Sequence, residues 1–168
     1  MLRIGTGFDA HRFEAGRKLI MGGVEIPFEY GLAGHSDADV LVHAIMDSML
    51  GALSLGDIGE YFPDTDDVYK DISSVILLEK IDSIIKKKGY AIVNIDTVII
   101  AETPKMKPYI ADMKKCLADV LAVSDDMIGI KATTTEKMGF TGRKEGIAAQ
   151  AVCLLINRGC SHLTAPMI

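Results

Sequence analysis

The sequence lacks tryptophan, has only three cysteines, and contains no apolar run that approaches the length of a membrane span. Apolar runs such as residues 75–78 are far shorter than the roughly 18 residues that a bilayer requires, so no membrane partner is expected. Arg3, Asp9 and His11 interrupt the place where a secretory signal would have its apolar segment. The cysteines are odd in number and show no C-x-x-C spacing, which indicates reduced thiols, two of them buried. We therefore expect a cytoplasmic protein.

Positive charge is also scarce. Lys and Arg total 18 against 23 Asp and Glu, which gives a formal net charge of −5. The run at residues 86–88 precedes Gly89, where cations complement the end of a helix, so it does not indicate a nucleic-acid partner. A phosphorylated ligand would have to be held by local groups: backbone N–H donors, a few cations or a metal.

The 168 residues predict a single domain over 1–168, with the composition of an ordinary globular protein: 49% hydrophobic and 24% charged. The patterns predict a strand at 3–11, a hairpin at 18–28, a helix at 37–53 capped by Ser36 or Asp37, a helix capped by Asp71, a strand at 94–101, a helix from Pro108 to Leu121, and strands at 127–133 and 147–156. A helix is the alternative for the last segment. Such interleaving predicts α/β or α+β packing in two layers.

The first candidate site is the D-x-H pair formed by Asp9 and His11. Residues i and i+2 of a strand share a face, so the carboxylate and the imidazole point the same way. Gly5 and Gly7 lie on that face and leave room for another element or a ligand to approach. Two such donors suit a divalent metal, but a third ligand is required.

A second candidate is the histidine-rich stretch at 35–43. On the predicted helix His43 shares a face with Asp39 and Asp47, opposite the apolar stripe, and the alternative to a ligand is a solvated histidine. His35 and Ser36 precede the helix on a glycine-flanked loop at its positive end, where phosphate contacts are favoured over a nucleophile pair.

Two further stretches combine polar residues with glycine. Asp57 and the loop at 62–66 read either as ordinary turns or as ligands of sugar hydroxyls or a cation, and the sequence leaves both open. Thr133 and Glu136 fit a capping box, but glycines rather than an amphipathic run follow them. Phosphate and Mg²⁺ binding suits that loop better.

Together these motifs resemble the 2-C-methyl-D-erythritol 2,4-cyclodiphosphate synthase family of isoprenoid biosynthesis. The resemblance runs in order from Arg3 to about Leu155 through D-x-H, G-H-S-D-A-D-x-L-x-H, G-D-I-G, F-P-D-T-D, P-K-M and K-A-T-T-T-E-x-x-G-F-T-G-R. It implies a compact domain with a mixed sheet on one side, about three helices on the other, and a homotrimer whose active sites lie between subunits.

The resemblance also implies roles for individual residues. Asp9, His11 and His43 would bind zinc, with Asp39 or another acceptor fixing the imidazole tautomer, and Glu136 would hold magnesium or manganese. His35 and Thr134 would act on the reacting phosphates, and Phe140 and Arg143 would face an isoprenoid diphosphate on the trimer axis. The substrate-binding set would be Asp9, His11, His35, Ser36, Asp57, Ile58, Gly59, Phe62, Pro63, Asp64, Thr65, Asp66, Ala101, Glu102, Thr103, Pro104, Lys105, Met106, Lys107, Ala132, Thr133, Thr134, Thr135, Glu136, Phe140 and Arg143.

The implied reaction is intramolecular. The 2-phosphate of 4-diphosphocytidyl-2-C-methyl-D-erythritol 2-phosphate would attack the β-phosphorus and expel CMP, as in a phosphorus–oxygen lyase. Two like-charged phosphates must approach, which two divalent cations would permit. The alternatives are a zinc-dependent phosphohydrolase and a non-catalytic trimeric module that binds a nucleotide or a metal.

Overall fold

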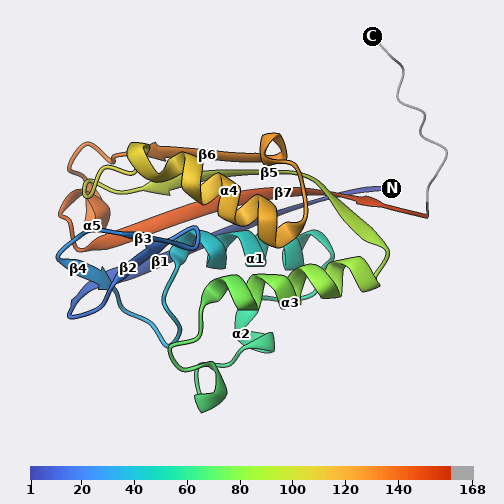
Figure 1. Cartoon of the computed structure of the whole chain (residues 1–168), viewed down its shortest axis with the longest axis horizontal. Coiled ribbons are helices and arrows are strands. Elements are labelled where there is room, and N and C mark those ends of the chain that lie inside the picture. The colour runs from blue at the N-terminus through green and yellow to red at the C-terminus, as the bar shows by residue number, and fades with distance from the viewer. Residues whose placement is uncertain (160–168) are drawn as a thin grey trace, which may run out of the picture.

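The computed structural model describes residues 1–159, and a five-stranded mixed sheet forms one layer of it (Figure 1). Its strand order is β4 (Tyr30–Leu32), β1 (Leu2–Ala15), β7 (Gly146–Asn157), β5 (Tyr90–Ile100) and β6 (Ile128–Thr133). Neighbouring strands are antiparallel except β5 and β6, which are parallel. The predicted final strand is therefore confirmed over its helical alternative.

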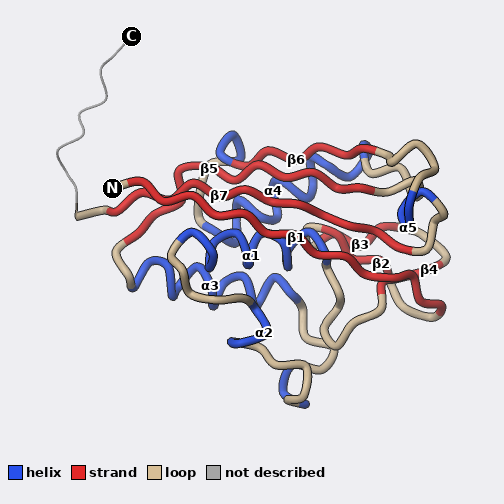
Figure 2. Tube along the Cα trace, turned by 180° about the vertical axis from the view of Figure 1, so that it is seen from behind, coloured by secondary structure: helices blue, strands red, loops and turns tan. Residues whose placement is uncertain are grey.

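The second layer consists of α1 (Val40–Ala52), α3 (Ser74–Lys87) and α4 (Ile110–Leu121), which lie on one side of the sheet (Figure 1). Seen from behind, the strands run across the front with the helices beyond them (Figure 2). The predicted hairpin is β2 (Leu19–Met21) and β3 (Val24–Ile26). Short helices complete the fold: α2 (Ile58–Tyr61), α5 (Gly139–Gly142) and single 3₁₀ turns at Asp67–Tyr69, Lys107–Tyr109 and Asp125–Met127. The expected two-layer α+β class is confirmed.

Helix α1 packs directly on the backbone of β1. A Cβ atom on Gly5 would lie 2.0 Å from the Ser48 carbonyl oxygen, and one on Gly7 would lie 2.1 Å from that of Ala44. Only glycine permits this approach, which confirms the cleared strand face expected from the sequence. The opposite face of β1 carries Ile4 and Phe8, which are 69% and 58% exposed.

The helix starts differ from the expected ones. Asp39 caps α1 in place of Ser36 or Asp37, and its carboxylate accepts a bond from the Val42 N–H at 3.1 Å. Asp71 does not cap α3, because it lies in a left-handed turn (φ 55°) three residues before the helix. The Asp37 carboxylate, remote in sequence, accepts from the Ser74 N–H at 3.1 Å instead.

Burial follows from this layering. Helix α1 lies between the sheet and α3 and is buried on nearly all sides, His43 included, so the solvated-histidine alternative is wrong. Cys153 is buried and Cys116 half-buried, both as free thiols, whereas Cys160 lies outside the described residues. Within residues 1–159, every helix is too short or too polar to cross a membrane.

Candidate metal centre and active-site cavity

Three side-chain donors converge where β1 and α1 meet. The Asp9 Oδ2 atom lies 2.8 Å from His11 Nε2 and 3.0 Å from His43 Nδ1, and the two nitrogens are 3.2 Å apart. Ligands of a tetrahedral zinc ion with bonds of about 2.0–2.1 Å are roughly 3.3 Å apart, so this triangle has nearly the size that zinc requires. The third donor expected from the sequence is thus in place.

A hydrogen bond to the backbone determines which ring nitrogen of His11 can bind a metal. Its Nδ1 donates to the Ala33 carbonyl oxygen at 2.7 Å, so Nε2 carries the lone pair. That lone pair faces the Asp9 carboxylate, which is also an acceptor. Two acceptors this close require a shared cation, and a divalent metal supplies it without a proton.

The pKa shifts of Asp9 and His11 also favour a positive charge between these side chains. Burial alone would raise the pKa of Asp9, but its contacts with His11 and His43, which act as donors when the rings are protonated, outweigh burial and lower that pKa well below the usual range. Burial would lower the pKa of His11, yet its bond to Asp9 raises it. Each carboxylate–imidazole contact therefore favours positive charge at this point.

The acidic neighbours of His43 on α1 have other partners. Asp39, one candidate for fixing the imidazole, accepts from the N–H groups of Gly22 and Gly23 at 2.9 and 2.7 Å and anchors the hairpin. Asp47 accepts from the Ile58 N–H at 2.9 Å and so attaches α2 to α1. Burial raises the pKa of Asp47.

A cavity of about 530 Å³ opens beside the triad. Expected site residues that line it are Asp9, His11, His35, Ser36, His43, Asp57, Ile58, Gly59, Phe62, Pro63 and Asp64. Asp57 also caps α2 through the Gly59 N–H at 2.9 Å, which confirms the turn interpretation, while its role as a ligand stays a prediction.

The cavity lining also departs from the expected set. Thr65 and Asp66 are not among the lining residues, although the Asp66 carbonyl oxygen lies 3.0 Å from His35 Nε2. Asp47 lines the cavity and was not predicted as a site residue, although its spacing of four from His43 was a usable signal. Tyr69 and Leu77 also contribute, and no sequence pattern distinguished them.

A second cavity of about 280 Å³ lies where β5 and β6 end. Because these strands are parallel, their carboxyl ends meet at one edge, and the Ala101 N–H donates to the Thr133 carbonyl oxygen at 3.0 Å. Its lining is Ala101, Glu102, Pro104, Lys105, Met106, Lys107, Ala132, Thr133 and Thr134. Of the predicted substrate-binding residues at 101–107 and 132–134, only Thr103 is absent from this lining.

The loop after β6 is not a capping box. Thr133 ends the strand, Glu136 has a left-handed backbone (φ 52°), and no helix begins before Gly139. Thr134 Oγ1 instead donates to Glu136 Oε1 at 2.8 Å, and both side chains are exposed. The hydroxyl and the carboxylate therefore remain accessible to a ligand.

Phe140 lines a third cavity of about 300 Å³ with Ala10, His11, Arg12 and Glu145. Arg143 is not part of that lining; its guanidinium pairs with Glu145, with Nε 2.8 Å from Oε1. The pairing raises the pKa of Arg143.

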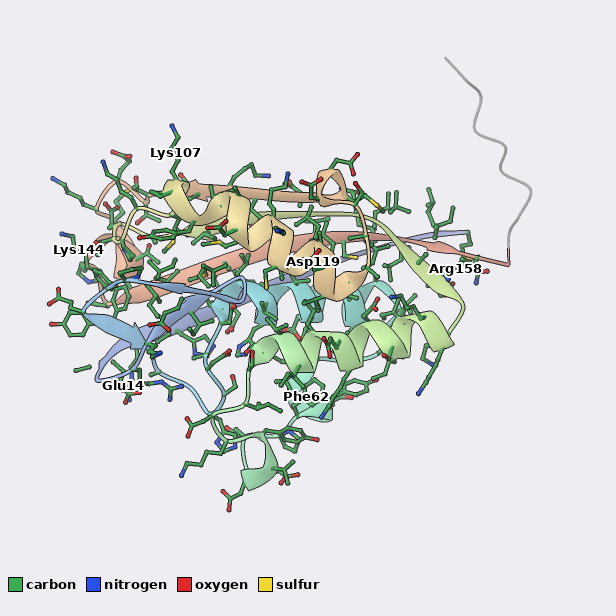
Figure 3. The ribbon with its side chains drawn as sticks, in the orientation of Figure 1. Glu14, Phe62, Lys107, Asp119, Lys144 and Arg158 are labelled. Atoms are coloured by element: carbon green, nitrogen blue, oxygen red, sulfur yellow. The ribbon has the colours of Figure 1, made fainter. Side chains whose placement is uncertain are left out.

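The first two cavities are separate and opposite in charge. They share no lining residue, and Phe62 and Lys107 lie on opposite sides of the molecule in Figure 3. The described lining of the larger cavity has four aspartates and no Lys or Arg, whereas the smaller has Lys105 and Lys107 against Glu102. One chain thus presents an acidic cavity and a separate basic one.

Comparison with known proteins agrees with this geometry. The model of the YgbB family matches residues 2–156. The 2-C-methyl-D-erythritol 2,4-cyclodiphosphate synthase of Lachnospira eligens is 60% identical over 154 residues, which cover 92% of this chain and 84% of the relative. The solved structure of IspF from Plasmodium falciparum in complex with CDP is 36% identical, with a TM-score of 0.82 and coverage of 94% of this chain and 97% of that one.

The structure of the bifunctional IspDF from Campylobacter jejuni is 42% identical with a TM-score of 0.89; the match covers 92% of this chain and 42% of that longer one. The family match spans nearly all of the described residues and includes the lining residues of both cavities. The chain therefore belongs to the YgbB family, whose matched relatives are 2-C-methyl-D-erythritol 2,4-cyclodiphosphate synthases.

Proposed function

We propose that this protein converts 4-diphosphocytidyl-2-C-methyl-D-erythritol 2-phosphate into 2-C-methyl-D-erythritol 2,4-cyclodiphosphate and CMP. An oxygen of the 2-phosphate forms a bond to the β-phosphorus, while the bond from that phosphorus to the oxygen bridging to the cytidyl phosphate breaks and CMP leaves. The observation that carries the proposal is the converging Asp9, His11 and His43 donors beside a cavity, in a chain 60% identical to synthases of that name. The reaction class is a phosphorus–oxygen lyase.

The residues fit this chemistry by position rather than by nucleophilic strength. His35 and Ser36 line the cavity beside the triad, where an imidazole and a hydroxyl can orient a phosphate. Asp57 and Asp64 face the same space and can accept bonds from the erythritol hydroxyls. Holding the two reacting phosphates at contact distance supplies several kcal/mol of the barrier reduction as prepaid entropy, roughly up to 7–11 kcal/mol in the best cases.

The triad fits a zinc ion by donor type and by spacing, and Glu136 offers one carboxylate oxygen to magnesium or manganese. When bound, the two metals neutralise the phosphate charges and polarise their oxygens. The larger cavity is otherwise acidic, so the chain's own residues there repel a polyphosphate and make bound cations necessary.

We infer that the two cavities are half-sites, so that one chain does not complete an active site. The basic cavity with Lys105, Lys107 and Thr134 suits the cytidyl diphosphate, and the acidic cavity suits the erythritol and zinc. They lie on different sides of one chain, so a second copy must bring its basic cavity to the first copy's acidic one. In a closed ring of three copies, the acidic cavity of each copy meets the basic cavity of one neighbour. The isoprenoid diphosphate near Phe140 and the cytoplasmic location stay predictions.

Phosphorus NMR of the metal-loaded protein with the cytidyl substrate tests the proposal. We expect CMP and a cyclic diphosphate in equal amounts, with no inorganic phosphate. Stoichiometric release of phosphate would establish the phosphohydrolase instead. Absence of turnover in a zinc-loaded oligomer would establish the binding module. A folded His43→Ala protein serves as the inactive control.

A further inference from the structure

The second ring nitrogen of His43 faces a buried pair of hydroxyls. Its Nε2 lies 3.0 Å from Ser74 Oγ and 3.2 Å from Ser36 Oγ. Ser74 is the first residue of α3 and is fully buried, and Ser36 is 7% exposed. Neither hydroxyl belongs to the triad, yet together they determine which nitrogen of His43 carries the proton.

The hydrogen bonds of Ser74 show that its hydroxyl must accept a hydrogen bond from His43. The Ser74 hydroxyl lies 2.5 Å from Asp37 Oδ1, and a carboxylate can only accept, so the single proton of Ser74 is directed to Asp37. The second carboxylate oxygen of Asp37 accepts from the Ser74 N–H at 3.1 Å, which holds the pair from both sides. The Ser74 oxygen is therefore left with lone pairs only, and its contact with His43 requires a proton on Nε2.

We propose that Ser74, held by Asp37, is a positioning residue that keeps a proton on His43 Nε2 and so presents the Nδ1 lone pair to a metal held together with Asp9 and His11. The inference rests on the proposed function only in taking the triad as the zinc site. It also accounts for Ser36: that hydroxyl accepts from the Ala38 N–H at 3.2 Å and lies 3.4 Å from Ser74 Oγ, to which it donates because the Ser74 proton is directed to Asp37.

Removal of the Ser74 hydroxyl should move the His43 proton from Nε2 to Nδ1. In Ser74→Ala the neighbouring Ser36 hydroxyl is free to turn and donate to Nε2, which places the proton on Nδ1, the atom meant for the metal. We expect zinc affinity to fall by roughly 10- to 100-fold, as for other groups that orient metal-bound histidines. The matched control is Ser48→Ala. It also removes a fully buried hydroxyl, which lies in α1 and donates to the Ile45 carbonyl oxygen at 2.7 Å.

Two measurements on the full chain test the proposal, and neither needs turnover. Competition with a chromophoric chelator gives the zinc Kd, and long-range proton–nitrogen correlation spectra of ¹⁵N-histidine-labelled, zinc-loaded protein show which nitrogen of His43 binds the metal and which carries the proton. Support would be zinc on Nδ1 and the proton on Nε2 in the unaltered protein, together with a zinc Kd that rises in Ser74→Ala and stays the same in Ser48→Ala.

The opposite results would overturn it. A folded Ser74→Ala protein with the original zinc Kd would remove Ser74 from this role. Should that variant fail to fold, the unaltered protein still decides, because zinc bound to Nε2 of His43 with the proton on Nδ1 contradicts the proposal. A chain that passes both tests yet releases no CMP would refute the proposed function and leave this inference standing.

Discussion

The contact between Gly7 and α1 gives the most direct test of how the fold builds the metal centre. In Gly7→Ala the new Cβ would lie 2.1 Å from the Ala44 carbonyl oxygen and 2.8 Å from the Ser48 nitrogen, and both are backbone atoms of a buried helix. An ordinary contact starts near 3.4 Å, so α1 and β1 must separate by about 1.3 Å. No side-chain rotation relieves this clash, because the atoms in the way belong to the main chain.

Two losses follow from that separation. Overpacking of a core typically costs about 1–3 kcal/mol, and a clash with helix backbone belongs at the upper end or beyond. The separation also moves His43 away from Asp9 and His11, whose donor atoms now lie 2.8–3.2 Å apart. Metal–ligand distances tolerate only about 0.2 Å, so we expect zinc affinity to fall by at least about tenfold even in the folded fraction.

Urea unfolding and chelator competition measure the two effects. The control is Gly51→Ala, since a Cβ there would meet only the Thr6 carbonyl oxygen at an ordinary 3.6 Å. Gly51 lies within α1, so alanine should leave stability unchanged or raise it by up to about 1 kcal/mol. If Gly7→Ala unfolded at the wild-type midpoint and bound zinc with the wild-type Kd, the close approach would not be what positions the triad.

Three further predictions concern the site itself. Zinc should co-purify at about one ion per chain, and metal analysis of the Asp9→Ala/His11→Ala protein should find it lost; full retention would refute the ligand assignment. Thr134→Ala and Glu136→Gln should keep the melting temperature nearly unchanged while kcat/KM falls by at least about tenfold, because a lost transition-state contact costs roughly 2.7–4 kcal/mol. The Glu136 variant should also need more Mg²⁺ to reach its maximum rate, and normal turnover in both variants would remove them from the site. Dilution below the association constant should abolish turnover, and a fully active monomer in sedimentation experiments would contradict the composite site.

The metal triad was predictable because local geometry carries most of it. Alternation in β1 places Asp9 and His11 on one face with the small residues, and that face is the one that meets α1. The environment of His43 was not predictable in the same way. Its helix is apolar around most of its circumference, and only the tertiary contacts with the sheet and α3 show that the polar stripe is buried too.

The cap of α3 was predicted wrongly because the partner of a polar group can be remote in sequence. Asp37 bonds the Ser74 N–H at the start of α3, and the local signal at Asp71 pointed to the wrong carboxylate. The separation of the two cavities is likewise a property of the assembled sheet, which no local pattern expresses. The family resemblance anticipated it by placing the active sites between subunits, and in the structure residues from 101–107 and 132–134 line one cavity that shares no residue with the cavity beside the triad.

The pairing of β1 with β7 has a consequence for how the chain acquires its structure. Leu2 pairs with Ile156 and His11 with Ile147, so the first strand completes its ladder only with the last one. Contacts so distant in sequence slow folding, because a large loop must close before they form. During synthesis both metal histidines emerge early, but the strand that carries His11 gains its central partner only after residues 146–157 are made. A ribosome-bound chain that stops before β7 would therefore expose an unpaired strand edge, where pairing with another nascent chain is the main hazard.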